Sequence, residues 1–295
     1  MKDFSPVRRL FRFLKWTIAV LLVLAIVAVA GIYFASERIL HRKYAVPLAD
    51  IVVPKTAEAI TEGERLARVY GCYGGCHGKR FEGNVLFEEA HVARLVAPSL
   101  HKAAARWNDA ELARIVRHGV RPDGESVFAM PSYVFKGMSD ADLGAILAFL
   151  RQAPDEAGLD PQLQVMALGR LGLATGKFES VASLIDHETV RPPAVTPKDP
   201  LALGDYIAHT NCAECHGADL RGRTEGPVIA PDLAIAGAYS LPAFTKLLRE
   251  AVPVGGQTLG LMGSAVRARF KYLTDDEIAA TYEYLLSRIA PKPRP

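Results

Sequence analysis

Four cysteines fall into two clusters, and a histidine ends each cluster. The second cluster reads Cys212-Ala213-Glu214-Cys215-His216, which is the C-x-x-C-H pattern of covalent haem attachment. Residues three apart are neighbours on one helical turn, so each thiol can reach one vinyl group of the same porphyrin. The histidine that follows can then serve as the proximal ligand of the iron. The cluster therefore predicts a c-type haem.

The first cluster is irregular, because three residues rather than two separate Cys72 from Cys76. We interpret it as a variant haem site with His77 as the iron ligand. An extra residue must bulge out if both sulfurs are to reach the vinyl groups, and Gly74-Gly75 tolerates the backbone angles that such a bulge requires. Attachment through Cys76 alone, with His77 still on the iron, stays open.

Three other uses of paired cysteines compete with haem. Exported cysteines commonly form disulfides, and cysteine with histidine can hold zinc. The usual zinc spacings place the second ligand pair roughly 12 to 20 residues away, whereas Cys76 and Cys215 are 139 residues apart (215 − 76). A redox C-x-x-C site is expected in a βαβ pattern, which this sequence lacks. Covalent haem is the favoured interpretation of both clusters.

An internal repeat indicates which elements approach the iron from the opposite side. Residues 138–150 align with residues 273–285 at an offset of 135, and both segments are typical of amphipathic helices with capping boxes. The expected cap pairs are Ser139 with Asp142 and Thr274 with Glu277. In this alignment Met138 is equivalent to Leu273, which cannot bind iron.

Met130 and Met262 are the predicted sixth ligands. They lie 53 and 46 residues after His77 and His216, and they precede the two repeated helices by comparable distances. A thioether opposite histidine closes the coordination of the iron and raises its reduction potential. Met166 lies between the repeats and is interpreted as a filler of the hydrophobic core.

The remaining histidines are interpreted as solvated side chains rather than iron ligands; they are His41, His91, His101, His118, His187 and His209. Arg117 or Arg121 is expected to pair with a haem propionate through charge-assisted hydrogen bonds. Arg267 and Arg269 are the corresponding candidates in the second half, with solvation at the surface as the alternative.

The N-terminal region predicts a membrane anchor. Residues 16–36 carry no charge and would form a helix about 30 Å long, which matches the hydrocarbon thickness of a bilayer. Five cations and one anion precede this run, so the positive-inside rule places residues 1–15 in the cytoplasm. The chain is then a single-pass protein of the inner membrane, with the rest in the periplasm. Ala28 and Ala30 leave a cleaved secretory signal open as an alternative.

Charge excludes one class of partner. The net charge is +3, and the first fifteen residues contribute +4, which leaves about −1 for the remainder. No basic face is left over to bind nucleic acid.

These residues together resemble the class I cytochrome c family, in the membrane-anchored diheme form with two domains in tandem. The resemblance covers most of residues 58–152 and 200–289. In that family a helix leads into the attachment motif and a last helix crosses it, which implies an all-α fold. A proline-containing loop lies against the proximal histidine and helps to orient it, and Pro98 and Pro231 occupy that loop here.

The expected organisation is an N-terminal transmembrane helix followed by two tandem class I cytochrome c domains. Its parts are a cytoplasmic tail (1–15), an anchor (16–36), a connector (37–57), cytochrome c domain 1 (58–153), a linker (154–200) and cytochrome c domain 2 (201–290). The prolines of the linker predict a semi-rigid spacer. A short helix is expected within it, around Gln162 to Leu171.

The resemblance implies an electron carrier with two c-type haems rather than an enzyme. Expected donors are a quinol-oxidising complex or a periplasmic dehydrogenase, and expected acceptors are a soluble cytochrome or a haem-copper oxidase. The chain is also compatible with a place as a subunit in a larger complex. A peroxidase-like diheme enzyme with one open iron site and a noncatalytic assembly or haem-delivery protein are the alternatives.

Overall fold

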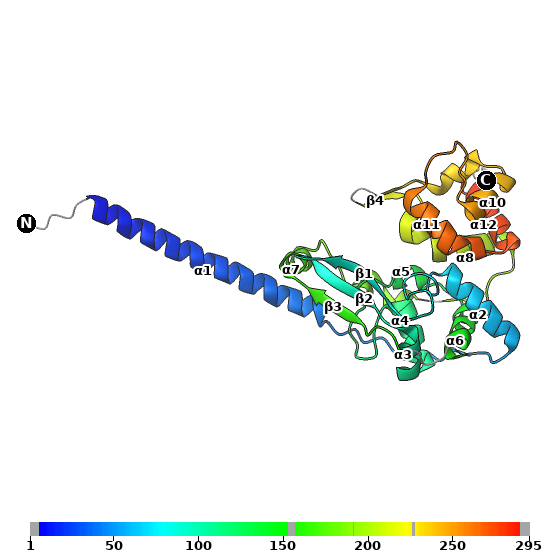
Figure 1. Cartoon of the computed structure of the whole chain (residues 1–295), viewed down its shortest axis with the longest axis horizontal. Helices are drawn as coiled ribbons and strands as arrows, with labels where there is room; N and C mark the ends of the chain where they lie inside the picture. Colours follow the sequence, from blue (N-terminus) through cyan, green and yellow to red (C-terminus); the bar gives the residue numbers. More distant parts are fainter. Residues whose placement is uncertain (1–5, 153–156, 191, 226–227, 290–295) are drawn as a thin grey trace, which may run out of the picture.

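The computed structural model describes residues 6–152, 157–190, 192–225 and 228–289 of the 295-residue chain. Most of this part is helical, as predicted. Helix α1 (Pro6–Leu40) projects away from two globular domains (Figure 1). Its apolar side chains from Leu10 to Phe34 are exposed within the structure, and its length and composition would allow it to cross a membrane. The helix begins before the predicted anchor and ends after it.

The C-terminal end of α1 packs against α7 (Ala167–Ala174). Arg170 of α7 makes this contact: its guanidinium donates to Glu37 at 2.7 Å and to Ser36 Oγ at 2.9 Å. It also lies 4.2 Å from the ring centroid of Tyr33. Domain 1 is therefore attached to the end of the apolar helix by a side chain and not by the connecting chain alone.

Domain 1 is built from helices around one hydrophobic core. They are α2 (Ala57–Val69), α3 (Leu100–Arg106), α4 (Asp109–His118), α5 (Ser132–Phe135) and α6 (Asp140–Gln152). Leu66, Leu143 and Met138 are almost completely buried in this core. Met138 is therefore part of the hydrophobic core of domain 1.

Domain 2 repeats this arrangement with its own core. It contains α8 (Pro200–Ile207), a π-helical turn η3 (Ala208–Cys212), α9 (Ala213–His216), the 3₁₀ turn η4 (Leu233–Ala238), α10 (Leu241–Glu250), α11 (Gly260–Ala268), the 3₁₀ turn η5 (Phe270–Tyr272) and α12 (Asp275–Ser287). Leu273, the equivalent of Met138, is likewise buried. The predicted repeat is therefore present in three dimensions.

The first and last helices of each domain cross at a glycine. A Cβ atom on Gly63 of α2 would lie 1.9 Å from the carbonyl oxygen of Ala145 in α6. A Cβ atom on Gly204 of α8 would lie 2.1 Å from the carbonyl oxygen of Ala280 in α12. Only glycine allows the backbones to approach this closely, and the crossing places each attachment motif, which follows the first helix, against the core.

Two small antiparallel sheets accompany the helices. The larger contains β1 (Asn84–Glu89), β2 (Ala93–Ala97) and β3 (Gln162–Val165) in that order, and the smaller pairs β4 (Arg223–Glu225) with β5 (Val228–Ala230). The expected helix from Gln162 to Leu171 was wrong in its first half. Gln162–Val165 instead forms a strand because β2 offers it an edge with unpaired backbone groups.

The residues predicted as a spacer are packed onto domain 1 at both ends. Near their start, β3 extends the sheet of domain 1. Near their end, the carbonyl oxygens of Pro193 and Ala194 accept the backbone N–H groups of Asp140 and Ala141 in the first turn of α6. Such N–H groups have no partner inside a helix, so the segment caps α6 while it leads to domain 2. Two short 3₁₀ turns, η1 (Val181–Leu184) and η2 (His187–Thr189), lie between.

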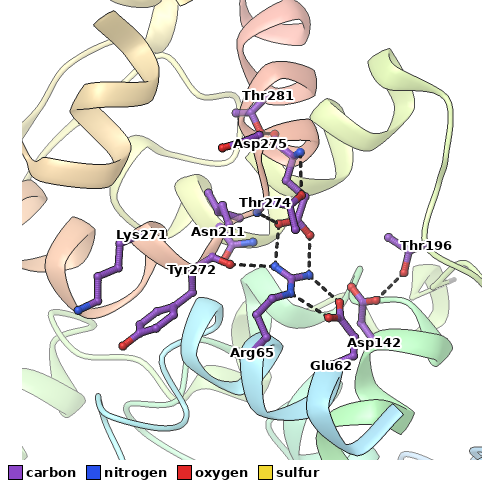
Figure 2. Close-up of polar contacts among 12 residues, drawn as sticks. Glu62, Arg65, Asp142, Thr196, Asn211, Lys271, Tyr272, Thr274, Asp275 and Thr281 are labelled. Carbon is purple, nitrogen blue, oxygen red and sulfur yellow. Dashed lines mark hydrogen bonds and ion pairs between the residues drawn. The ribbon is translucent and has the colours of Figure 1, made fainter. Parts of the chain in front are cut away.

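A bidentate ion pair joins the two domains. Arg65 of α2 donates to both carboxylate oxygens of Glu277 in α12, each at 2.8 Å, and to the carbonyl oxygen of Tyr272 at 3.0 Å. Glu62 accepts from the other side of the same guanidinium, as Figure 2 shows. Glu277 also completes the predicted capping box with Thr274. Charge-assisted bidentate geometry makes this a strong contact with a fixed orientation.

A second interdomain contact surrounds the carboxylate of Asp142. The Tyr206 hydroxyl of domain 2 donates to Asp142 at 2.7 Å and accepts from the backbone N–H of Ser139 at 3.0 Å. Tyr70 and Thr196 donate to the same carboxylate. The predicted capping box is therefore half formed: Ser139 Oγ accepts from the backbone of Asp142, but the carboxylate serves the interface.

These two contacts use equivalent positions of the repeat. Asp142 corresponds to Glu277 at the start of the last helix, and Arg65 corresponds to Tyr206, two residues after the crossing glycine. Each domain thus contributes its first helix to one contact and its last helix to the other. The interface is approximately two-fold symmetric, although the side chains that form its two halves differ.

Replacing Gly63 by alanine should lower the free energy of unfolding of domain 1 by ~1–3 kcal/mol or more, because the new methyl group would separate α2 from α6. Gly137→Ala is the matched control, since its nearest neighbour would be Thr210 at an ordinary 3.9 Å. Denaturant unfolding followed by circular dichroism measures both. Equal stability of the two variants would contradict the close crossing.

Tyr206→Phe should destabilise the interface by ~1–3 kcal/mol, because it removes a donor from a buried carboxylate and an acceptor from a buried N–H. Limited proteolysis in the last part of the linker, residues 192–199, should become faster. Tyr282→Phe removes a hydrogen bond within domain 2, to the carbonyl oxygen of Tyr239, and serves as the control. The prediction fails if both variants are cleaved at the same rate.

Candidate haem sites

The predicted residues of domain 1 meet at one cavity of about 270 Å³. Cys72, Cys76, His77, Pro98 and Met130 all line it. Apolar side chains form most of the remaining wall, among them Phe81, Leu100, Trp107 and Leu147. An apolar cavity with two thiols, an imidazole and a thioether provides the groups that a covalently attached haem requires.

A backbone hydrogen bond orients the histidine in each motif. His77 Nδ1 lies 2.9 Å from the carbonyl oxygen of Pro98, and His216 Nδ1 lies 2.8 Å from that of Pro231. A carbonyl oxygen can only accept, so Nδ1 must carry the proton and Nε2 must carry the lone pair. Burial lowers the pKa of both histidines, with the hydrogen bond acting in the opposite direction, and so favours the neutral ring. Both imidazoles therefore present a nitrogen suited to iron.

The extra residue of the first motif is absorbed by a glycine turn. Gly71 and Gly74 adopt left-handed backbone angles, with φ of 76° and 75°. The backbone N–H of Cys76 donates to the carbonyl oxygen of Gly71 at 3.0 Å. A Cβ atom on Gly75 would lie only 2.4 Å from that same oxygen. Gly74 thus adopts the left-handed conformation of the turn, whereas Gly75, without a side chain, leaves room for the carbonyl oxygen of Gly71.

The second motif is helical instead. The π-helical turn η3 ends at Cys212, and α9 carries the motif on to His216. A π turn widens the helix by one residue per turn and is common at functional sites. The two attachment motifs therefore reach similar histidine positions by different local backbone routes.

The two predicted thioether ligands lie beside the cores. Met130 is half-buried, lines the cavity of domain 1 and packs against its core. Met262 of α11 is also half-buried and packs against the core of domain 2, as does Cys212. The prediction that Met166 fills the hydrophobic core was wrong: it lies half-buried at the N-cap of α7, outside the cores of both domains, because the chain leaves β3 there to enter α7.

The predicted arginines divide into structural and cavity-lining groups. Arg117 is buried. It donates to the carbonyl oxygen of Met138 and pairs with Asp140 at 2.7 Å, so its guanidinium is used in contacts within domain 1. Arg121 lines the cavity and pairs with Glu125.

Three of the histidines predicted to be solvated are not simply so. His101 is buried, with Nε2 2.6 Å from the carbonyl oxygen of Arg80, and His118 lies 3.1 Å from His187 (Nδ1 to Nδ1).

Three residues at the domain 1 cavity come from domain 2. They are Glu214, Ala268 and Arg269, and Glu214 and Arg269 are charged. The sequence predicted that Arg269 would pair with a haem propionate of its own domain. It gave no prediction for Glu214, which is recognisable only by its place between Cys212 and Cys215.

Arg269 also affects the thiols of both motifs. Burial raises the pKa of Cys72 and of Cys212 to about 12, and the Arg269 cation opposes this rise at both thiols. One side chain is therefore close to both attachment motifs.

Comparisons with known proteins agree on the family of both domains. Residues 58–150 match the family described as "Cytochrome C oxidase, cbb3-type, subunit III", and residues 201–288 match the family "Cytochrome c". The alcohol dehydrogenase (quinone) cytochrome c subunits of Gluconacetobacter polyoxogenes and Komagataeibacter europaeus are each 24% identical over 253 residues, covering 76% of this chain and 54% of the relative.

The fructose dehydrogenase cytochrome subunit of Gluconobacter japonicus is 22% identical over 263 residues, covering 78% of this chain and 52% of the relative. The chain thus spans about half the length of the curated relatives it matches.

Gly75→Ala should lower haem attachment to the first motif, because the methyl group would collide with the carbonyl oxygen of Gly71 and displace Cys76. Gly74→Asn is the matched control: asparagine tolerates the left-handed conformation, and the nearest atom to its Cβ lies 3.9 Å away. Peptide mass spectrometry of protein matured in a cytochrome c-producing host measures haem at each motif. Full occupancy in Gly75→Ala would contradict the packing argument.

Proposed function

The chain belongs to the cytochrome c family through both of its globular domains, and on this premise we propose that it is a membrane-anchored diheme electron carrier. One haem would be held by Cys72, Cys76 and His77, and the other by Cys212, Cys215 and His216. Met130 and Met262 would complete the coordination of the two irons. The protein passes single electrons between redox partners and transforms no substrate itself.

The observation that carries this proposal is the repeated imidazole geometry. In both domains a proline carbonyl oxygen accepts from Nδ1 of the motif histidine and leaves Nε2 able to bind iron. A chain that used these cysteines and histidines for zinc would need further ligands nearby. The described residues contain no group of three or more histidine, cysteine, aspartate or glutamate side chains placed to hold a metal ion.

These side chains would hold the haem and keep its iron from reacting with a substrate. Haem iron changes oxidation state by one electron, and histidine with methionine favours a raised reduction potential. The largely apolar cavity wall would limit the access of water, and the thioether of Met130 would fill the position at which a substrate such as peroxide would bind. A closed site of this kind supports electron transfer over a peroxidase-like reaction.

We place both domains on the periplasmic side of the inner membrane. The cations before residue 16 and the uncharged run that follows support this orientation. The contact of Arg170 with Ser36 and Glu37 supports a retained helix, because it joins domain 1 to the end of that helix.

We propose a dehydrogenase as the electron donor. The names of the relatives support it, since they are cytochrome subunits of alcohol dehydrogenase (quinone) and fructose dehydrogenase. The chain would then act as the electron-transfer subunit of a complex and deliver electrons to a soluble cytochrome or a haem-copper oxidase.

Met130→Ala and Met262→Ala should each remove the methionine-to-iron charge-transfer band from one ferric haem and leave the other unchanged. Met138→Leu is the control, because Met138 is buried in the core and the exchange nearly conserves volume. Absorption spectra are recorded together with the intact mass and a haem assay of the full-length chain.

Wild-type protein should carry two covalent haems, both low-spin. Properly matured material without covalent haem would refute the proposed function. High-spin iron at either site would favour the peroxidase-like alternative instead.

A further inference from the structure

Arg269 connects the two attachment regions across the domain interface. It follows α11 of domain 2, yet its Nε donates to the carbonyl oxygen of Val69 in domain 1 at 3.0 Å. Its side chain packs on Gly71, where an added Cβ would lie 3.2 Å from the Arg269 side chain. Gly71 immediately precedes Cys72. A domain 2 cation is therefore part of the wall around the domain 1 motif.

Glu214 brings the second motif to the same place. It lies between Cys212 and Cys215, accepts from the guanidinium of Arg269 at 2.9 Å and lines the domain 1 cavity. The side chains of Arg269 and Glu214 are only 15% and 30% exposed, so solvent screens their charges less than it screens a surface pair. The two attachment motifs thus meet at one ion pair.

The ion pair leaves part of the arginine unsatisfied. The second terminal nitrogen of Arg269 is buried and finds no hydrogen-bond partner among the described residues. A buried donor without a partner is costly in a folded protein and calls for an explanation. The unpaired nitrogen belongs to a side chain that lines the cavity in which the first haem is proposed to lie.

We propose that Arg269 and Glu214 form a shared electrostatic site that sets the reduction potentials of both haems. This inference rests on the proposed function, because it requires a haem at each motif. A cation near the iron disfavours the more positive ferric state and raises the potential, whereas an anion lowers it. Because one pair lies against both motifs, a change in either side chain acts on both haems, and the sign depends on which charge is lost.

The test uses the full-length, haem-loaded chain and the variants Arg269→Gln, Glu214→Gln and the double variant. Redox titration followed by visible spectra gives the two midpoint potentials. Arg269→Gln should lower both and Glu214→Gln should raise both, each by a shift on the order of tenfold in the oxidised-to-reduced ratio at fixed potential, about 59 mV for one electron. The double variant should lie between the two single variants.

Two further variants separate charge from structure. Lys177→Gln removes an exposed cation after α7 that does not line the domain 1 cavity, and it should leave both potentials unchanged. Arg269→Lys keeps the charge and should retain most of the wild-type potentials even where Arg269→Gln folds poorly. A structural role alone would not give opposite signs for Arg269→Gln and Glu214→Gln.

The proposal is overturned if Arg269→Gln and Glu214→Gln shift the potentials in the same direction, shift only one haem, or shift neither. Haem content is measured on each sample. Absence of covalent haem from the wild type would refute the proposed function, whereas two haems with unresponsive potentials would refute the shared site alone.

Discussion

The hydrogen bond from each motif histidine to a proline carbonyl is the constraint on which the proposed chemistry depends. A free imidazole exchanges its proton between two nitrogens, and only the nitrogen without a proton can bind iron. Pro98 and Pro231 fix the proton on Nδ1 in their respective domains. In each domain the rest of the fold keeps the proline carbonyl and the attachment motif in fixed relative positions. The first and last helices cross at Gly63 in domain 1 and at Gly204 in domain 2, where no side chain fits.

The interface shows how a tandem repeat can be joined without a separate docking surface. The acidic residue in the first turn of each last helix reaches the first helix of the other domain. In one half the contact is an arginine with a carboxylate, and in the other it is a tyrosine with a carboxylate. Both Asp142 and Glu277 also lie at helix N-termini, where the helix dipole stabilises a negative charge. The repeat therefore supplies anions at both positions, and the neighbouring domain supplies the donors.

The two domains are not equivalent where the motifs meet. Domain 1 has an additional residue in its motif, a glycine turn in place of a π-helical one, and a sheet that extends into the segment after α6. Arg269 of domain 2 packs on the glycine turn at Gly71, where an added Cβ atom would lie in tight contact, 3.2 Å from the arginine side chain. The extra residue of the first cluster and the contact with Arg269 therefore involve the same glycine turn.

The sequence by itself determined the repeat and predicted the chemistry of the motifs. Thiols beside histidine at fixed short spacing predict attachment from local geometry, and the aligned helices selected Met130 and Met262 over Met138, which the structure buries in the core. The uncharged N-terminal run likewise predicted a long apolar helix from its composition. The tertiary structure alone decided that Gln162–Val165 is a strand, since that depends on the edge of β2 far away in the chain. It also decided that Asp142 serves the interface, that Arg117 is held by Asp140, and that Arg269 lies at the other domain's cavity. A long polar side chain finds its partner only after packing has removed it from water, and the sequence does not record which surfaces will meet.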